Sequence, residues 1–517
     1  MTKQSFLKGA LILILAGMIT RFLGFINRIV VARLMGEEGV GLYMMALPTL
    51  FLVMTLTQMG LPVAISKRVA EADALGDHAK IKRILVVSIM ITSLTSIAFT
   101  ILMIIGAPFI ASTLLTDERT IWPLIAISPI VPITAISAII RGYFQGKQNM
   151  TPQSIAQVIE QLVRIVCVAF FINLFLPYGV EYAAAGAMIS VILGEFISLL
   201  YMLHRFKQNK QVKIRRRFFS YLSSSRQTMR ELFSISLPST GSRMIGSISN
   251  FLEPILVAQS LAIAGVTATL ATKQYGELTG YALPLLYLPT FITHSLAIAL
   301  VPSISEAEAK NHRKLIHYRI HQSIRISFAS GAIATVIITL FSVQILSYMY
   351  GTANASDFIL LMAPFYILLY IQSPLQAALQ ALDLARPAMW NSLFGAVVKF
   401  VVLFFLASNP EFGIMGVAIS MSVGVVLITL LHLATLRKAI QFYIPFKDIC
   451  KMVLLILLTF IAGTILKETY TLMEPNLIIF LILLVLLTTI YIGFLFILHF
   501  ITREELKQIP FLQKWLN

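Results

Sequence analysis

Apolar segments long enough to cross a lipid bilayer follow one another along almost the whole 517-residue chain. A membrane-spanning helix needs about 20 mostly apolar residues. Fourteen segments approach or exceed that length, at approximately 9–31, 40–62, 84–111, 121–140, 154–176, 183–203, 232–262, 279–302, 326–349, 358–380, 389–408, 414–436, 451–466 and 476–500. Because backbone groups in lipid must be hydrogen-bonded within their own segment, these segments can only be helices. The sequence therefore predicts an all-α polytopic membrane protein with about fourteen transmembrane helices.

Lysine and arginine are concentrated in the short stretches between the apolar segments. Of the 40 basic residues, 31 lie on the predicted side of the N-terminus, four lie on the opposite side and five lie inside spans. Loops rich in Lys and Arg stay in the cytoplasm, so both termini of this multi-pass protein are predicted to be cytoplasmic. This pattern, rather than nucleic-acid binding, accounts for the net charge of +17. Anionic phospholipids at the cytoplasmic face are expected partners.

The chain repeats itself across its two halves. Residues 20–26 (Thr-Arg-Phe-Leu-Gly-Phe-Ile) match residues 242–248 (Ser-Arg-Met-Ile-Gly-Ser-Ile), residues 61–66 are similar to residues 301–305, and Gly186 and Gly194 recur as Gly416 and Gly424. Two six-helix halves of the same orientation are expected to be related by a pseudo-two-fold axis along the membrane normal, with the functional site between them.

The repeat predicts four parts of the chain. They are an N-terminal six-helix lobe at 1–204, a basic cytoplasmic linker at 205–230, a C-terminal six-helix lobe at 231–438, and two further helices with a cytoplasmic tail at 439–517.

Two arginines lie deep inside predicted spans at equivalent places of the repeat, Arg21 in the first span and Arg243 in the seventh. A charged group at the centre of a bilayer costs at least about 2.5 kcal/mol and usually faces a cavity or a partner. Two arginines facing each other would repel unless an anion lay between them, and the planar guanidinium suits a phosphate or pyrophosphate. Arg21 and Arg243 are therefore the leading candidates for binding an anionic substrate.

Other polar residues inside spans form a second group of candidates. Asn27, Arg28 and Asn250 are assigned to substrate binding, and Glu160, Arg164, Glu253 and Lys399 to a coupling or cavity charge network. Structural roles remain open for several of them. Glu160 and Arg164 have the i,i+4 spacing of an intrahelical ion pair, Arg28 could extend to the membrane interface, and Glu253 precedes Pro254 and could support a kink. Glu195 is interpreted as structural, and Lys399 is left between the two roles.

Motifs of soluble enzyme chemistry are missing from the sequence. There is no Walker A loop, since residues 142–147 (Gly-Tyr-Phe-Gln-Gly-Lys) have the wrong spacing, and there is no Gly-x-Ser-x-Gly, His-Glu-x-x-His or Cys-x-x-Cys motif. Cys167 and Cys450 have no partner at metal-ligand spacing and are interpreted as small packing residues. No cofactor, metal or catalytic residue is predicted, and the chain is expected to be a transporter.

Three short motifs carry a family resemblance. Arg21-Phe-Leu-Gly-Phe, then Ala32-Arg-Leu-Met-Gly-Glu-Glu-Gly-Val-Gly-Leu-Tyr43, then Gly60-Leu-Pro-Val-Ala-Ile-Ser-Lys67 resemble the polysaccharide-transporter branch of the multidrug/oligosaccharidyl-lipid/polysaccharide exporter superfamily, which includes the lipid II flippases. The resemblance implies alternating access around a central cationic cavity. In the lipid II flippases the first helix carries Ser-Arg-x-x-Gly-Phe-x-Arg-Asp; here Arg21, Gly24 and Phe25 match, and Asn27-Arg28 replaces Arg-Asp.

The resemblance implies a flippase that moves a lipid-linked anionic saccharide. An undecaprenyl-pyrophosphate-linked peptidoglycan precursor, used in spore-cortex or cell-wall synthesis, is the expected cargo, with cell-wall synthesis proteins as candidate partners. One alternative is a cation-coupled multidrug exporter, whose cationic substrates would favour an acidic cavity, whereas the spans here hold five basic and three acidic residues. A second is a membrane-embedded glycosyltransferase or polymerase, which would need acidic catalytic groups in a sizeable external loop.

Overall fold

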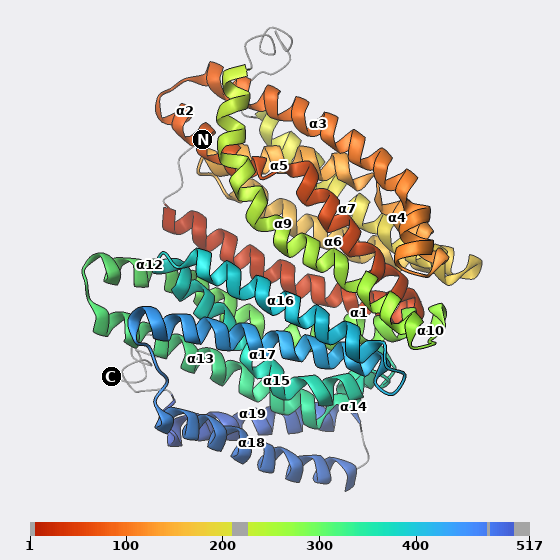
Figure 1. Cartoon of the computed structure of the whole chain (residues 1–517), viewed down its shortest axis with the longest axis vertical. Coiled ribbons are helices and arrows are strands. Elements are labelled where there is room, and N and C mark those ends of the chain that lie inside the picture. Colours follow the sequence, from red (N-terminus) through yellow and green to blue (C-terminus); the bar gives the residue numbers. More distant parts are fainter. Residues whose placement is uncertain (1–5, 209–225, 473–475, 501–517) are drawn as a thin grey trace. The chain divides into compact units, whose positions relative to one another are not determined.

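The computed structural model of the chain describes residues 6–208, 226–472 and 476–500, and these residues form helices and short connections without a strand (Figure 1). Contacts between residues divide the chain into two compact units. Unit 1 holds residues 1–280 and 407–414, and unit 2 holds residues 281–406 and 415–517. Most of the predicted basic linker, residues 209–225, lies outside the described residues, and the predicted division into lobes at 1–204, 231–438 and 439–517 stays a prediction.

The helices of unit 1 come mostly from the first half of the chain. They are α1 (Phe6–Gln58), α2 (Leu61–Ala74), α3 (His78–Phe109), η1 (Ile110–Leu114), η2 (Glu118–Thr120), α4 (Ile121–Ile127), α5 (Ile130–Gly146), α6 (Thr151–Phe175), η3 (Leu176–Tyr178), α7 (Val180–Gln208), α9 (Arg226–Ile263) and α10 (Ala268–Gly276). The helical turn η4 (Glu277–Ala282) crosses from unit 1 into unit 2.

The helices of unit 2 follow. They are α11 (Leu283–Tyr287), α12 (Thr290–Ala309), α13 (Arg313–Leu340), α14 (Ser342–Tyr350), α15 (Ser356–Ala381), α16 (Ala385–Ala407), α17 (Gly413–Ile440), α18 (Phe446–Leu472) and α19 (Leu477–Ile497). Their common core gathers buried side chains of α12, α13, α15, α18 and α19. Within it Tyr370 donates a hydrogen bond to the Leu286 carbonyl, and Tyr491 donates one to the Ala329 carbonyl.

The helix α1 is broken at Gly36. Its backbone there has φ 70° and ψ −178°, a combination that is open almost only to glycine. Two helical segments therefore meet at residue 36, and this break separates the first two predicted spans, 9–31 and 40–62. At 53 residues α1 would be far too long for one bilayer crossing, so the break allows the chain to change direction between two crossings.

Eleven helices of the described residues are long and apolar enough to cross a membrane, or twelve if the bent pair Ala268–Tyr287 and Thr290–Ala309 is one span. The predicted number of fourteen is not confirmed. One reason is that α1, which continues through α2 in this count, holds two of the predicted segments. Another is that α9, which covers the predicted span 232–262, carries Arg243, Asn250 and Glu253 and is not among the eleven.

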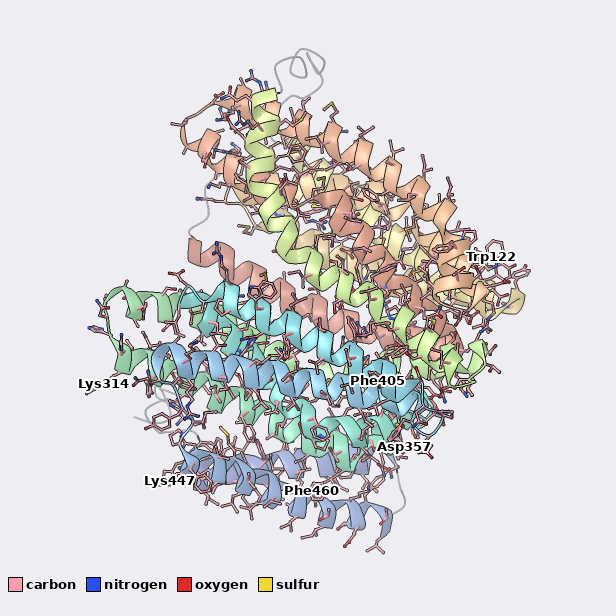
Figure 2. The ribbon with its side chains drawn as sticks, viewed as in Figure 1. Trp122, Lys314, Asp357, Phe405, Lys447 and Phe460 are labelled. Atoms are coloured by element: carbon pink, nitrogen blue, oxygen red, sulfur yellow. The ribbon has the colours of Figure 1, made fainter. Side chains whose placement is uncertain are left out.

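One predicted span was too short. The apolar run at 451–466 is part of the longer helix α18, which has 27 residues, because a helix continues into polar residues at its ends. Along the helices many large apolar side chains are exposed, among them Phe405 at 70% and Val485 at 67% (Figure 2). In water such a surface would associate, whereas in lipid it is solvated.

Candidate functional site

Two exposed rows of polar residues lie on α1 and α9, both in unit 1. Arg243, Gly246 and Asn250 follow one another at i, i+3 and i+7 on α9, a spacing that places them on one helical face. The side chains of Arg243 and Asn250 are exposed, and a Cβ added at Gly246 would meet no described atom within 4 Å. This face of α9 is therefore open.

The same spacing recurs on α1 as Arg21, Gly24 and Arg28, and both arginines are exposed there. The sequence repeat and the structure thus give two matching rows, each beginning with an arginine. An exposed cation within an apolar helix is costly if it faces lipid, so these residues are expected to face water or a ligand.

The helices α1 and α9 contact each other directly. The hydroxyl groups of Thr55 on α1 and Ser247 on α9 are 2.7 Å apart and share a hydrogen bond. Ser247 lies one turn after Arg243 and one turn before Asn250, so the second segment of α1 contacts α9 between these two residues of the row. The functional site expected between the two halves of the chain stays a prediction.

Buried amide groups mark the contact between α1 and α6. The side chain of Asn27 is buried, and its Oδ1 accepts no hydrogen bond from the described residues. The same holds for Oε1 of Gln161 on α6, which lies 3.7 Å from the position of a Cβ at Gly24. A buried acceptor without a donor costs about 1–3 kcal/mol. The interface beside the arginine row of α1 therefore offers two carbonyl oxygens to a donor from water or a ligand.

Two ion pairs, one within α6 and one between α5 and α7, lie close together. Arg164 donates to Glu160 at 2.5 Å on α6, as their spacing predicted, and Arg141 on α5 donates to Glu195 on α7 at 3.5 Å. Close packing brings the pairs together, since a Cβ at Gly194 would lie 2.9 Å from the Glu160 carbonyl oxygen. The sequence interpretation counted Arg141 as a loop residue and missed its part in this network. The buried carboxylate of Glu195 was the signal that a cation had to be near.

The other two members of the predicted charge network lie elsewhere. Glu253 is on α9, which continues through Pro254 without a break, and it interacts electrostatically with Tyr275 of α10. Lys399 is on α16 in unit 2, where its ammonium group lies 4.6 Å from the ring centre of Phe400. That Lys399 belongs to one charge network with Glu160, Arg164 and Glu253 stays a prediction.

Lys399 nevertheless has a counterpart in unit 1. A Cβ at Gly424 of α17 would lie 3.3 Å from the Cβ of Lys399, and a Cβ at Gly194 of α7 would lie 3.4 Å from the Cβ of Arg164. Gly194 and Gly424 match in the predicted repeat, and each packs against the basic residue of a neighbouring helix, Arg164 and Lys399 respectively. The residue four positions before Lys399 is Gly395 instead of a glutamate, so only the first repeat has the intrahelical ion pair.

A third polar cluster, which the sequence did not reveal, joins α1 to η2 and α10. Asp117 is 4% exposed; Arg119 and Thr272 donate to its Oδ2 at 2.8 and 2.7 Å, and Arg119 also pairs with Glu38. Burial alone would raise the pKa of Asp117, but the hydrogen bonds from Arg119 and Thr272 hold that pKa below its ordinary value.

Glycines bring the backbones of α1 and α10 together at the same place. A Cβ at Gly41 would lie 2.0 Å from the Thr272 carbonyl oxygen, and one at Gly276 would lie 2.2 Å from the Glu37 carbonyl oxygen. Any larger residue at either position would force the two helices apart.

Comparison with known proteins gives likenesses over nearly the whole chain. Residues 6–308 match the family described as Polysaccharide biosynthesis protein, and residues 278–405 match the family MatE. Stage V sporulation protein B of Bacillus subtilis (strain 168) is 52% identical over 510 residues, which are 99% of this chain and 98% of that protein. Lipid II flippase MurJ of the same organism is 24% identical over 426 residues, which are 77% of this chain and 76% of that protein.

A solved structure of lipid II flippase MurJ in an inward closed conformation has the same fold. Its TM-score is 0.67 at 15% sequence identity, with 93% of this chain and 97% of that chain covered. The all-α membrane fold and the family resemblance predicted from the sequence are confirmed by these likenesses.

Proposed function

Because the chain belongs to the polysaccharide biosynthesis protein family, we propose that it is a flippase that moves a lipid-linked saccharide across the membrane by alternating access. The observation that carries the proposal is the pair of matching rows on α1 and α9, in which exposed arginines lie within helices of membrane-spanning length. Such cations need an anion or water around them, and the pyrophosphate of a lipid-linked saccharide is an anion of suitable chemistry.

Arg21 and Arg243 hold the pyrophosphate in this proposal. Each guanidinium can donate two parallel hydrogen bonds to phosphate oxygens, which a lysine ammonium cannot match in geometry. Arg28 and Asn250, two turns further along the same faces, extend the row toward the next part of the cargo. The anion offsets the repulsion between like charges, so the site is complete only when the cargo is bound.

The buried amide oxygens beside α1 suit the saccharide part of the cargo. Asn27 Oδ1 and Gln161 Oε1 are acceptors without donors among the described residues, and sugar hydroxyl groups are donors. Satisfying these acceptors would recover part of the cost of burying them, and the cargo would thereby be preferred over a simple lipid phosphate.

We assign as cargo an undecaprenyl-pyrophosphate-linked peptidoglycan precursor for cell-wall or spore-cortex synthesis. Support comes from the relatives, one named a sporulation protein and the other a lipid II flippase. In this proposal both termini lie in the cytoplasm, and the cargo moves from the cytoplasmic to the outer leaflet of the bacterial plasma membrane, the direction that the family resemblance implies. Cell-wall synthesis proteins are the partners that would use the transported cargo.

The multidrug-exporter alternative is supported by the MatE match over residues 278–405. Its cationic substrates would favour carboxylates in the cavity, but two of the three acidic residues inside the spans, Glu160 and Glu195, are already paired with Arg164 and Arg141. The third, Glu253, lies near Tyr275 of α10. The exposed residues of the two rows are cationic or neutral. The charge of the candidate site therefore favours an anionic cargo over a cationic drug.

Reconstitution into liposomes tests the proposal. A fluorescent undecaprenyl-pyrophosphate saccharide is placed in both leaflets, and the fraction that becomes accessible to a membrane-impermeant quencher or enzyme is followed over time. We expect rapid equilibration with the protein and none with protein-free liposomes, and no uptake of a cationic dye in the same vesicles. Transport of the dye without movement of the saccharide would contradict the proposal and support a drug exporter.

A further inference from the structure

A small cavity of about 130 Å³ lies in unit 2, lined by residues of α13, of the start of α18 and of the turn at His499 and Phe500 after α19. Several of its lining groups can donate to an anion. They are His321, Gln322 and Arg325 from α13, Lys451 from α18 and His499 after α19, with Asp448 of α18 as the one carboxylate.

Helical spacing brings these groups to one place. Residues 318, 321, 322 and 325 share one face of α13, and residues 448, 451 and 452 share one face of α18. The connection from α17 to α18 is fixed against α13, because His317 Nε2 lies 3.0 Å from the Ile440 carbonyl oxygen and the His321 ring lies 4.6 Å from the Phe442 ring. The cavity is thus built from three helices and a packed connection.

Charge balance in the cavity favours a singly charged anion. The lining holds two basic side chains, Arg325 and Lys451, and one acidic side chain, Asp448, so its formal charge without the histidines is +1. Lys451 forms no ion pair within the described part of the chain, although Asp448 lies only one turn before it. A phosphodiester carries one negative charge, and therefore matches this lining better than a free phosphate dianion.

The size and surroundings of the cavity indicate which phosphodiester fits. Pockets for drug-sized ligands measure roughly 300–1,000 Å³, so a volume of about 130 Å³ excludes a nucleotide or an oligosaccharide. Next to it, α18 presents an exposed apolar row that includes Ile449 at 43%, Val453 at 51% and Leu457 at 53%. A lipid would find a site for its headgroup phosphate in the cavity and an apolar surface for its acyl chain along the helix.

We propose that this cavity, the α18 pocket, binds the phosphodiester headgroup of an anionic membrane lipid. Basic pockets between transmembrane helices commonly bind anionic headgroups. The bound lipid would connect α13, α18 and the end of α19 at the face of the membrane that carries the basic loops. This site is separate from the arginine rows of α1 and α9, and lipid binding there does not depend on the proposed transport function.

Native mass spectrometry of the full-length protein in detergent tests the proposal, with phosphatidylglycerol and phosphatidylcholine as probes. We expect phosphatidylglycerol to bind more tightly, and Lys451→Gln to weaken its binding about five-fold, the effect of roughly one basic residue at a lipid headgroup. Lys451→Arg, which keeps the charge, should retain binding. Lys447→Gln is the matched control, because Lys447 is exposed one turn earlier on α18 and does not line the pocket (Figure 2).

Several results would overturn the proposal. Equal weakening by Lys447→Gln and Lys451→Gln would show that lipid responds to surface charge alone. Equal binding of phosphatidylglycerol and phosphatidylcholine would show that the pocket does not recognise an anionic headgroup. Displacement of phosphatidylglycerol by millimolar glycerol phosphate would identify a soluble anion as the ligand. Arg21→Ala should leave lipid binding unchanged, so that failure of the lipid site and failure of the transport proposal give different results.

Discussion

Glu37 on α1 and Lys273 on α10 form an ion pair of 3.2 Å between Oε2 and Nζ. The stretch Ala46-Leu47-Pro48 recurs as Ala282-Leu283-Pro284, an offset of 236 residues, and the same offset takes Glu37 to Lys273. If the predicted repeat aligns the chain in this way, Glu37 and Lys273 are expected to lie near the predicted pseudo-two-fold axis. Their opposite charges attract each other, whereas like charges at both positions would repel.

The helices α1 and α10 should separate during each transport cycle if this contact closes one end of the transporter. Gly280 lies in η4, directly after α10, and a Cβ there would lie 3.5 Å from the Cβ of Val40 on α1, which is within the range for a disulfide. We expect Val40→Cys with Gly280→Cys, in a background without Cys167 and Cys450, to cross-link and to stop saccharide transport until a reductant is added. Val40→Cys alone is the control and should remain active; Gly280→Cys alone is not used, because a Cβ at Gly280 would lie 2.1 Å from Val40 Cγ1. Full transport by the cross-linked protein would show that this contact does not open.

Asp117 should contribute measurably to stability, because its buried carboxylate accepts charge-assisted hydrogen bonds from Arg119 and a further one from Thr272. We expect Asp117→Asn to lower the free energy of unfolding by about 1.5–3 kcal/mol, measured by thermal unfolding in detergent. Glu411→Gln, at an exposed loop position, is the control and should change stability by less than about 0.5 kcal/mol.

The same carboxylate predicts a pH dependence. Since the pKa of Asp117 is lowered in the folded protein, its contribution is fully present above its ordinary value of 3.8 and is lost as the pH falls through the lower, folded value. Asp117→Asn should therefore destabilise the protein at neutral pH and have a smaller effect in strong acid. An equal loss at both pH values would contradict the role of the charge.

Variants of Glu160 and Arg164 distinguish a structural role of this ion pair from a role in transport. If the pair is structural, Glu160→Gln alone and Arg164→Met alone should each destabilise the protein by about 3 kcal/mol, while the double variant should lose much less, because no unpaired charge is left buried. Thermal unfolding of the four proteins measures this coupling. Single variants with unchanged stability but without transport would instead place the pair in the transport mechanism.

The sequence predicted the positions of the helices better than the contacts between them. Long apolar runs identified most helices, and the gap between 31 and 40 contains the break at Gly36, because local composition and glycine determine such features. The pair Glu37–Lys273 and the partner of Glu195 could not be predicted in the same way, since each depends on residues far apart in the chain. Arg141 was assigned to a loop because it follows an apolar run, whereas the helix α5 continues beyond it to Gly146.

The candidate site was predicted in part. The repeat identified Arg21 and Arg243, and the structure adds that each begins a row with the same spacing. The helical spacing of Glu160 and Arg164 predicted their ion pair, which is present. The unsatisfied oxygens of Asn27 and Gln161 could not be predicted, since burial of an amide depends on which helix packs against it.

Orientation in the membrane is tested by cysteine labelling at two exposed positions. We expect Glu411→Cys to react with an impermeant maleimide in intact cells and Lys447→Cys to react only after permeabilisation, because basic loops remain cytoplasmic. The parent protein without cysteines is the control. The reverse pattern would place both termini outside.

Transport by variants of the two row arginines tests the central claim most directly. Arg21→Ala and Arg243→Ala, together with Arg21→Lys, Arg243→Lys and the exposed control Arg437→Ala at the end of α17, are reconstituted at equal protein content with the lipid-linked saccharide. We expect each alanine variant to insert into the membrane and to have the stability of the parent protein, but to lose transport. Each lysine variant should keep only part of the transport activity, because the bidentate geometry is lost. Arg437→Ala should transport normally. Normal saccharide transport by both Arg21→Ala and Arg243→Ala would contradict the account.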